Sequence, residues 1–146
     1  MRRLRTARQL CSARKRLRDA AAGAFAVAEA ETWARAARRD VVEAERQQLL
    51  EASPARLMRA STGNELLIIE EERQLADRLL MVAEQERREA AKVSEVHRQA
   101  LARRESELRT AEHVLEEVLE ERDALALRTE QHALDDLSAA RARRDG

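Results

Sequence analysis

The chain has 146 residues, of which 38% are charged and 1% aromatic, and its 28 basic side chains balance 28 acidic ones. With only Trp33 and Phe25 as aromatic residues, a globular core built on large rings is excluded. Such a composition is typical of long helices and coiled coils, and we expect a single all-α domain over residues 1–146.

Charge is distributed unevenly along the chain. The first eighteen residues carry eight basic side chains and no acidic one, whereas residues 64–146 carry 21 acidic and 14 basic side chains. The single cysteine, Cys11, excludes an internal disulfide and fits a reducing compartment. No apolar run approaches the roughly 20 residues of a membrane span or forms a signal sequence, so we expect a cytoplasmic protein without membrane insertion.

The first predicted helix covers about residues 3–52. Apolar residues recur there at intervals of three and four, which places them on one stripe of a helix that needs a partner. The predicted stripe comprises Leu10, Ala13, Leu17, Ala20, Ala24, Val27, Ala34, Ala37, Val41 and Ala44.

The predicted apex, residues 53–64, interrupts the helical pattern. Ser53 followed by Pro54 predicts the start of a short apical helix, because serine is a good N-cap and proline fits the first helical position. Gly63 is the candidate residue just after that helix. Thr62 and Glu65 have the spacing of a capping box that would begin the next helix.

The second predicted helix covers about residues 65–143 and contains neither proline nor glycine. Arg104 and Arg122 interrupt its apolar stripe, and we expect their stems to lie along it. The stripe comprises Leu75, Leu79, Val82, Ala90, Val93, His97, Leu101, Leu108, Ala111, Leu115, Val118 and Leu125.

Two helices joined by a short connection predict an antiparallel coiled-coil hairpin with a short apical helix or turn. Because the second helix is the longer one, it would extend about 25 to 30 residues beyond the first. Leu125, Leu127, Leu134 and Leu137 lie in that extension, so another copy or another protein would have to cover them.

The sequence offers no pattern typical of an active site. His97, His113 and His132 are too far apart to share a helical turn, so we expect no metal site. Neither a phosphate-binding glycine loop nor a nucleophile motif is present. We therefore predict a protein that is not an enzyme and binds no cofactor.

The basic N-terminal segment has several interpretations. It is compatible with binding to an acidic protein, to nucleic acid or to an anionic membrane surface, and also with simple exposure to water. No leucine heptads follow it and no aromatic residues interleave it, so it lacks the patterns of the usual helical DNA-binding and single-strand-binding proteins. We therefore expect a protein partner and no nucleic acid.

The layout of the chain resembles that of the central stalk proteins of type III secretion systems, the flagellar FliJ and virulence-system YscO (SctO) family. The resemblance is carried by three stretches, RRLRTARQLCSARKRLRDA, SPARLMRASTGNELL and ELRTAEHVLEEVLEERDALALRTEQHAL. It implies a bacterial stalk in the cytoplasm that docks into a hexameric export ATPase by its two chain ends. The apex would reach the membrane protein of the export gate, and secretion chaperones would be further partners.

The resemblance also implies contact residues. Those implied for the ATPase are Arg2, Arg3, Arg5, Arg8, Arg14, Arg16, Leu125, Leu134, Leu137, Arg141, Arg143 and Arg144. Those implied for the gate or chaperones are Leu57, Met58, Leu66 and Ile69. Two alternatives stay open on the residues alone, a self-associating coiled-coil scaffold and a nucleic-acid binder with a basic helix.

Overall fold

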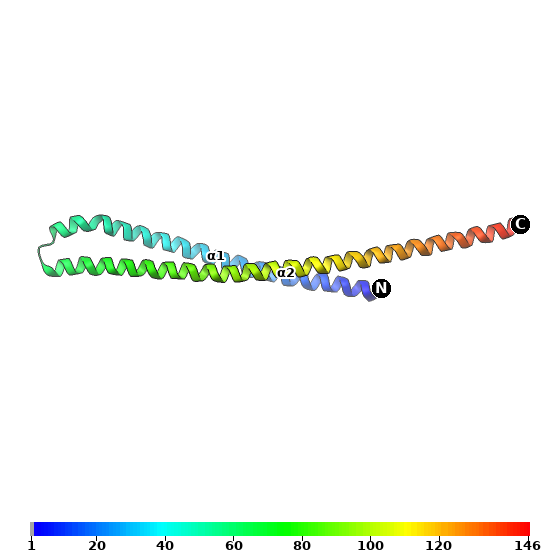
Figure 1. The fold of residues 1–146 in the computed structure, drawn as a ribbon, viewed down its shortest axis with the longest axis horizontal. Helices are drawn as coiled ribbons and strands as arrows, with labels where there is room; N and C mark the ends of the chain where they lie inside the picture. Colours follow the sequence, from blue (N-terminus) through cyan, green and yellow to red (C-terminus); the bar gives the residue numbers. More distant parts are fainter. Residues whose placement is uncertain (1) are drawn as a thin grey trace. The chain divides into compact units, whose positions relative to one another are not determined.

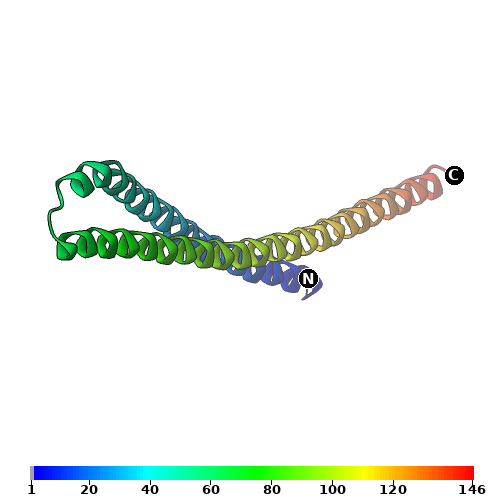
Figure 2. The same cartoon turned by 60° about the vertical axis from the view of Figure 1, so that its left-hand side comes forward.

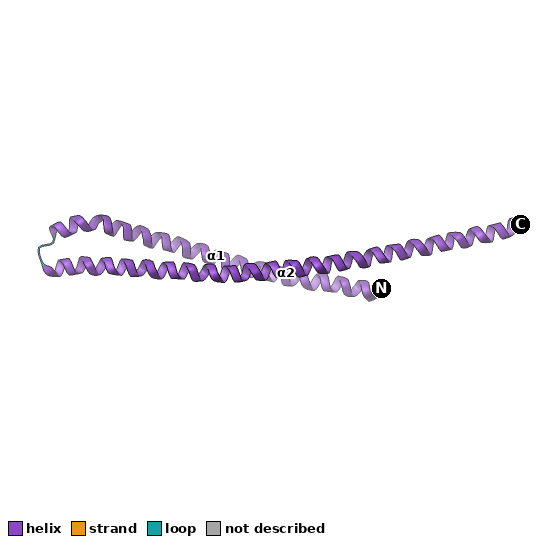
Figure 3. Cartoon of the chain, viewed as in Figure 1, coloured by secondary structure: helices purple, strands orange, loops and turns teal. Residues whose placement is uncertain are grey.

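Two helices account for nearly the whole chain. The computed structural model describes residues 2–146, in which α1 is Arg2–Arg59 and α2 is Gly63–Asp145 (Figure 1). Colouring by secondary structure shows helix and connection and no strand over this range (Figure 3). The predicted all-α class is confirmed, and so is the greater length of the second helix, 83 residues against 58.

The chain divides into two compact units that each contain parts of both helices. One unit combines the residues up to Ala20 with Ala102–Gly146, and we call it the terminal unit. The other is Ala21–Leu101 and contains the connection between the helices, and we call it the central unit.

The connection is shorter than the predicted apex and consists of residues 60–62 (Figure 2). The hydroxyl oxygen of Thr62 accepts a hydrogen bond from the backbone N–H of Glu65 at 3.3 Å, as a helix cap does. The Glu65 carboxylate in turn accepts one from the backbone N–H of Ser61 at 2.7 Å, one residue before the cap. Gly63 begins α2 and does not have a positive φ, so its predicted role at a helix C-terminus is wrong.

Helix α1 passes through Pro54, which corrects the predicted end of the helix at residue 52 and the predicted separate apical helix. Ser53 does not cap a new helix; its hydroxyl donates to the Leu49 carbonyl oxygen at 2.7 Å within the same helix. Pro54 has no N–H, so the carbonyl of Leu50 lacks its usual intrahelical donor. The structure places this irregularity inside α1, about one and a half turns before its end.

The residues of α1 that face α2 follow a regular alternation of three and four positions. This spacing is that of a coiled-coil seam, but many of the residues in it are small or polar. The seam positions of α1, all buried or half-buried, are Leu4, Ala7, Cys11, Arg14, Arg18, Ala21, Phe25, Ala28, Thr32, Arg35, Arg39, Val42, Arg46, Leu49, Ser53 and Arg56.

The facing residues of α2 follow the same alternation from Ala76 onward, and Ile69 lies seven residues before Ala76. Its buried or half-buried seam positions are Ile69, Ala76, Leu80, Ala83, Arg87, Ala90, Ser94, His97, Leu101, Arg104, Leu108, Ala111, Leu115 and Val118. In the central unit the hydroxyl oxygen of Thr32 lies 3.1 Å from the Ala90 carbonyl oxygen, a direct contact with the backbone of the other helix. Small seam residues make so close an approach possible.

Arginines at the seam of α1 form ion pairs with carboxylates of α2. In the central unit the pairs are Arg35–Glu86 at 2.9 Å, Arg39–Glu84 at 2.6 Å, Arg46–Asp77 at 2.7 Å and Arg56–Glu72. In the terminal unit the seam pair is Arg14–Glu107 at 2.9 Å, and the exposed Arg3, which lies outside the seam, pairs with Glu121 at 2.7 Å. Within each unit, the residue number of the partner on α2 falls as that of the arginine rises.

The apolar stripe predicted for the first helix is wrong, because it lies one residue before the buried seam along most of the helix. All ten of its members are exposed, and most of them directly precede a seam residue, as Leu10 precedes Cys11 and Val27 precedes Ala28. One residue is a rotation of about 100° around a helix. The reason is chemical: arginine stems pack in the seam while their heads reach carboxylates, so the seam is not the most apolar face.

The stripe predicted for the second helix is confirmed in part. Ala90, His97, Leu101, Leu108, Ala111, Leu115 and Val118 lie in the seam, and so does Arg104. Leu75, Leu79, Val82 and Val93 are exposed, each one residue before a seam position, and Leu125 and Arg122 lie on the exposed end of α2.

The clearest apolar cluster lies in the terminal unit. Leu4 and Ala7 of α1 pack with Val118 of α2, and Leu115 and Leu119 complete the contact. This cluster fixes the start of α1 against α2, because the adjacent ion pairs are largely exposed and such pairs contribute little by themselves.

We expect Ala111→Glu to destabilise the protein, because Ala111 is buried in the seam and a carboxylate there would lose water without gaining a partner. The free energy of unfolding should fall by about 2–3 kcal/mol. Thermal unfolding followed by circular dichroism measures the change. The matched control is Ala102→Glu at an exposed position, which should change stability by less than about 0.5 kcal/mol; equal effects of the two substitutions would contradict the seam.

Candidate protein-docking surfaces

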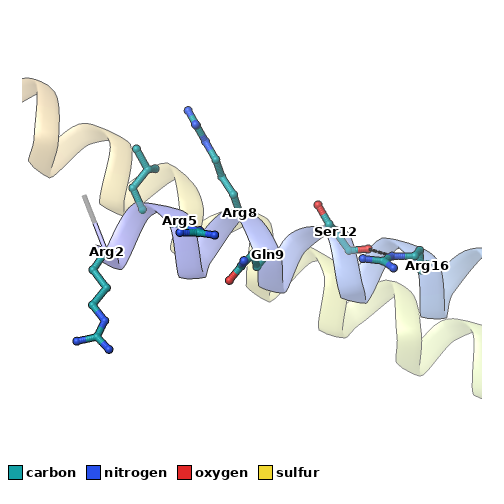
Figure 4. Close-up of a pocket in the computed structure, with 7 residues that line it drawn as sticks. Arg2, Arg5, Arg8, Gln9, Ser12 and Arg16 are labelled. Carbon is teal, nitrogen blue, oxygen red and sulfur yellow. Dashed lines mark hydrogen bonds between the residues drawn. The ribbon is translucent and has the colours of Figure 1, made fainter.

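The N-terminal turns of α1 carry a positively charged groove. Arg2, Arg5, Arg8 and Arg16 line it together with Leu4, Gln9 and Ser12, and its volume is about 760 Å³. Figure 4 shows Arg2 and Arg8 extending away from the helix, while Arg16 bonds back to the Ser12 carbonyl oxygen at 3.4 Å. We call this surface the cationic groove; its four arginines form no ion pair within residues 2–146 and can therefore meet an acidic partner.

Two of the arginines implied as ATPase contacts are engaged inside the terminal unit. Arg3 pairs with Glu121, and Arg14 pairs with Glu107, which also pairs with Arg104 at 3.0 Å. The pairing with Arg104 and then Arg14 lowers the pKa of Glu107. Arg3 and Arg14 thus join the helices, and the arginines of the first eighteen residues that form no ion pair all line the cationic groove.

The last part of α2 is exposed on every side. All residues from 120 to 146 are exposed, and Leu125, Leu127, Leu134 and Leu137 keep between 61% and 65% of their surface accessible. We call residues 120–146 the free end of α2. Four exposed leucines on one helical segment are unusual for a surface that stays in contact with water.

The C-terminal arginines lie apart from the cationic groove. Residue Arg3 pairs with Glu121, and Arg141 lies 20 residues further along α2 in the same terminal unit. Twenty residues of helix span roughly 30 Å. Arg141, Arg143 and Arg144, which the resemblance implies as ATPase contacts, therefore do not lie beside the N-terminal arginines, although all three are exposed.

An apolar patch surrounds the connection in the central unit. Leu57 and Leu66 are about half exposed, and Met58 is 90% exposed. Ile69 is only 8% exposed because it occupies a seam position, so its predicted role as a surface contact is wrong. Leu67 and Ile68 are exposed instead. We call Leu57, Met58, Leu66, Leu67 and Ile68 the connection patch.

The histidines and the cysteine are not gathered into a reactive site. Within residues 2–146 there is no group of side chains suited to hold a metal ion. His97 is half-buried in the seam, and His113 lies 3.8 Å from the carboxylates of Glu116 and Glu117 on the surface of α2. Partial burial and then Glu112 raise the pKa of the Cys11 thiol, which favours its unreactive protonated form.

Over the residues that the structure describes, no helix is long and apolar enough to cross a membrane. Comparison of the chain with protein-family models, with curated proteins and with solved structures gives no match. The candidate sites are therefore inferred from the exposed side chains of the two units alone.

The ion pairs make stability depend on pH in a defined direction. Hydrogen bonds from Arg39 and then Arg87 lower the pKa of Glu84 below its ordinary value of 4.5. Arginine partners likewise lower the pKa values of Glu72, Glu95 and Glu107. A carboxylate whose pKa is lower in the folded state stabilises the fold above its unfolded-state pKa, and this contribution is lost as pH falls through the folded-state value.

We expect the melting temperature to be steady at neutral pH and to fall as pH drops below about 4.5, because the paired carboxylates become protonated. Glu84→Gln should lower the melting temperature at neutral pH and reduce its further loss in acid. Glu130→Gln, at an exposed position on the free end of α2, is the matched control and should follow the wild type. An acid profile of Glu84→Gln identical to that of the wild type would show that the pairs with Arg39 and Arg87 do not stabilise the fold.

Proposed function

We propose that the protein is a non-enzymatic central stalk of a type III secretion export ATPase. It would act in the bacterial cytoplasm at the base of the membrane secretion apparatus and hold no cofactor. The ATPase ring would bind the terminal unit, and the export gate or secretion chaperones would bind the connection patch. The proposal depends mainly on two features of the terminal unit. The arginines of the cationic groove form no ion pair within residues 2–146, and the last part of α2 has no other helix packed against it.

The architecture proposed for this role is an antiparallel coiled-coil hairpin. Support comes from the ion pairs of the central unit, in which the partner's number falls from Glu86 to Glu72 as the arginine's number rises from Arg35 to Arg56. The three-residue connection and the continuous seam spacing of both helices are what such a hairpin requires.

The terminal unit has the two features that docking into a protein ring requires. Arg2, Arg5, Arg8 and Arg16 offer charge-assisted contacts to acidic side chains, and arginine is favoured at interfaces for that chemistry. The leucines of the free end of α2 would lose their exposed apolar surface only when another protein surrounds them. Arg141, Arg143 and Arg144 would contact the ring at a separate level along α2.

The connection patch suits the second partner. Five apolar side chains lie close in sequence around residues 60–62, and the flexible, highly exposed Met58 can adapt to a protein surface. Gate or chaperone contact would therefore use Leu57, Met58, Leu66, Leu67 and Ile68.

We expect reversal of three charges in the cationic groove, in the variant Arg2→Glu, Arg5→Glu, Arg8→Glu, to abolish binding to the hexameric export ATPase encoded by the same genome. The helices should remain intact because these side chains are exposed. Calorimetric titration and ATPase stimulation measure the effect, with a loss of affinity of at least about 100-fold for three charge contacts. The control reverses Arg59, Arg78 and Arg103, which are also exposed, and should bind normally; wild-type protein that does not bind the ATPase would reject the stalk role.

The free end of α2 provides a second prediction. Leu125→Ser with Leu134→Ser should weaken ATPase binding about tenfold or more, because apolar area is no longer buried on docking. The same titration measures it. Leu127→Ser, seven residues before Leu134 and therefore on the same side of the helix, should weaken binding in the same direction. If the pair of substitutions instead dissolves a homo-oligomer and leaves ATPase binding unchanged, the scaffold alternative is favoured over the stalk.

A further inference from the structure

The boundary between the two units crosses both helices. It lies between Ala20 and Ala21 of α1 and between Leu101 and Ala102 of α2. Residues 15–27 of α1 and residues 91–106 of α2 contain this boundary, and we call these two segments the joint. The joint differs from the flanking parts of the seam in its packing, in its polar contacts and in its helix-forming residues.

No side chain of the joint is buried. On α1 the nearest buried side chains are Ala7 and Ala28, one on each side of the joint, and on α2 they are Ala83 and Leu108. The seam continues through the joint, but its residues there are only half-buried. Apolar burial therefore stabilises the joint less than it stabilises the flanking parts of the seam.

The joint also lacks polar contacts between the helices. The last ion pair before it on α1 is Arg14–Glu107, and the first polar contact after it is made by Thr32 with a backbone carbonyl of α2. Arg18 occupies the seam position between them, yet its guanidinium pairs with Asp19 of its own helix at 2.8 Å. Over the whole joint, all of which the structure describes, no hydrogen bond or ion pair joins α1 to α2.

Weak helix formers occur in the joint on both helices. Gly23 lies in the interior of α1, where glycine is less favourable than alanine. On α2, four of the five residues 93–97 are valine, serine or histidine, which are also weaker helix formers than alanine or leucine. Both helices therefore resist local distortion less within the joint.

Neither the backbone nor the packing requires a glycine at position 23. No glycine within residues 2–146 has a positive φ, and a Cβ added at Gly23 would meet no atom within 4 Å. An alanine would fit there without strain and would form a more stable helix. The structural effect of Gly23 is therefore to lower the local stability of α1.

We propose that the joint is a hinge, at which α1 and α2 bend so that the two units change their relative orientation. Three independent observations coincide there, namely low burial, the absence of polar contacts across the seam and weak helix propensity. The hinge is a property of the chain alone and does not depend on the proposed function. In a stalk, it would allow the terminal unit to stay bound to one partner while the connection patch follows another.

Distances between spin labels on α1 test the hinge. In a chain with Cys11→Ser, labels at the exposed positions of Ala13→Cys and Ala37→Cys lie before and after the joint. In a straight helix they would be about 36 Å apart. We expect the wild-type chain to give a broad distribution of distances that extends below this value, and Gly23→Ala to narrow it.

Two controls make this result specific. Gly63→Ala is the matched substitution, because a Cβ there also meets no atom within 4 Å and Gly63 lies outside the joint; it should leave the distribution unchanged. Labels at Ala30→Cys and Gln48→Cys, both exposed and both after the joint on α1, should give a narrow distribution. A distribution between positions 13 and 37 that is equally narrow, or equal effects of Gly23→Ala and Gly63→Ala, would overturn the proposal.

Hydrogen exchange measures the local stability of the joint. Backbone amides of residues 15–27 should exchange faster than those of residues 30–50, and Gly23→Ala should slow them about fivefold, as the difference in helix propensity predicts. Ala24→Gly should speed their exchange, whereas Ala44→Gly, the same substitution at an exposed position beyond the joint, should not. Equal exchange in the two segments, or no slowing by Gly23→Ala, would show that α1 is not weakened at the joint and would reject the hinge.

Discussion

The structure depends on arginines that lie in the seam between the helices and reach carboxylates on the opposite helix. Arg35, Arg39 and Arg46 occupy positions where a two-helix coiled coil normally has aliphatic residues. Their side chains are half-buried, and their guanidinium groups pair with Glu86, Glu84 and Asp77. Because each pair joins one position of α1 to one position of α2, the pairs and the buried seam residues together specify the register within the central unit.

This use of the seam leaves apolar residues on the outside of both units. The leucines of the free end of α2, the connection patch and residues such as Val27 and Leu75 are exposed, whereas the buried cluster around Leu4 and Val118 is small. Apolar area that stays in water contributes nothing to stability, so a partner that covered it would stabilise the fold. The proposed stalk role would cover part of that area.

The sequence predicted the helices well and their faces poorly. Strong helix formers and the absence of aromatic residues were sufficient for the all-α class and for the longer second helix. The end of α1 was missed because Ser53 and Pro54 fit a helix start equally well, and only the bond from Ser53 to Leu49 shows that the helix continues. The seam was predicted one residue away from where it lies. The prediction assumed that the most apolar stripe of a helix is the buried one, and it did not consider arginines that pair with carboxylates on the other helix.

The candidate sites were predictable to the extent that they depend on exposure alone. Arg2, Arg5, Arg8 and the leucines near the C-terminus lie on the surface as expected. The engagement of Arg3 with Glu121 and of Arg14 with Glu107 could not be foreseen, since each pair joins residues about a hundred positions apart and depends on the register. Burial of Ile69 follows from the same register.

Pro54 affects where helix α1 unfolds locally. A helix that lacks one backbone hydrogen bond close to its end separates locally at a lower free-energy cost than the rest of the molecule. The segment from Pro54 to the connection includes Arg56 and Arg59, and an exposed chain that opens transiently is where proteases cut first. A single cleavage by trypsin in this segment would leave two complementary helical fragments, each ending or beginning beside the connection, that can still associate through the seam.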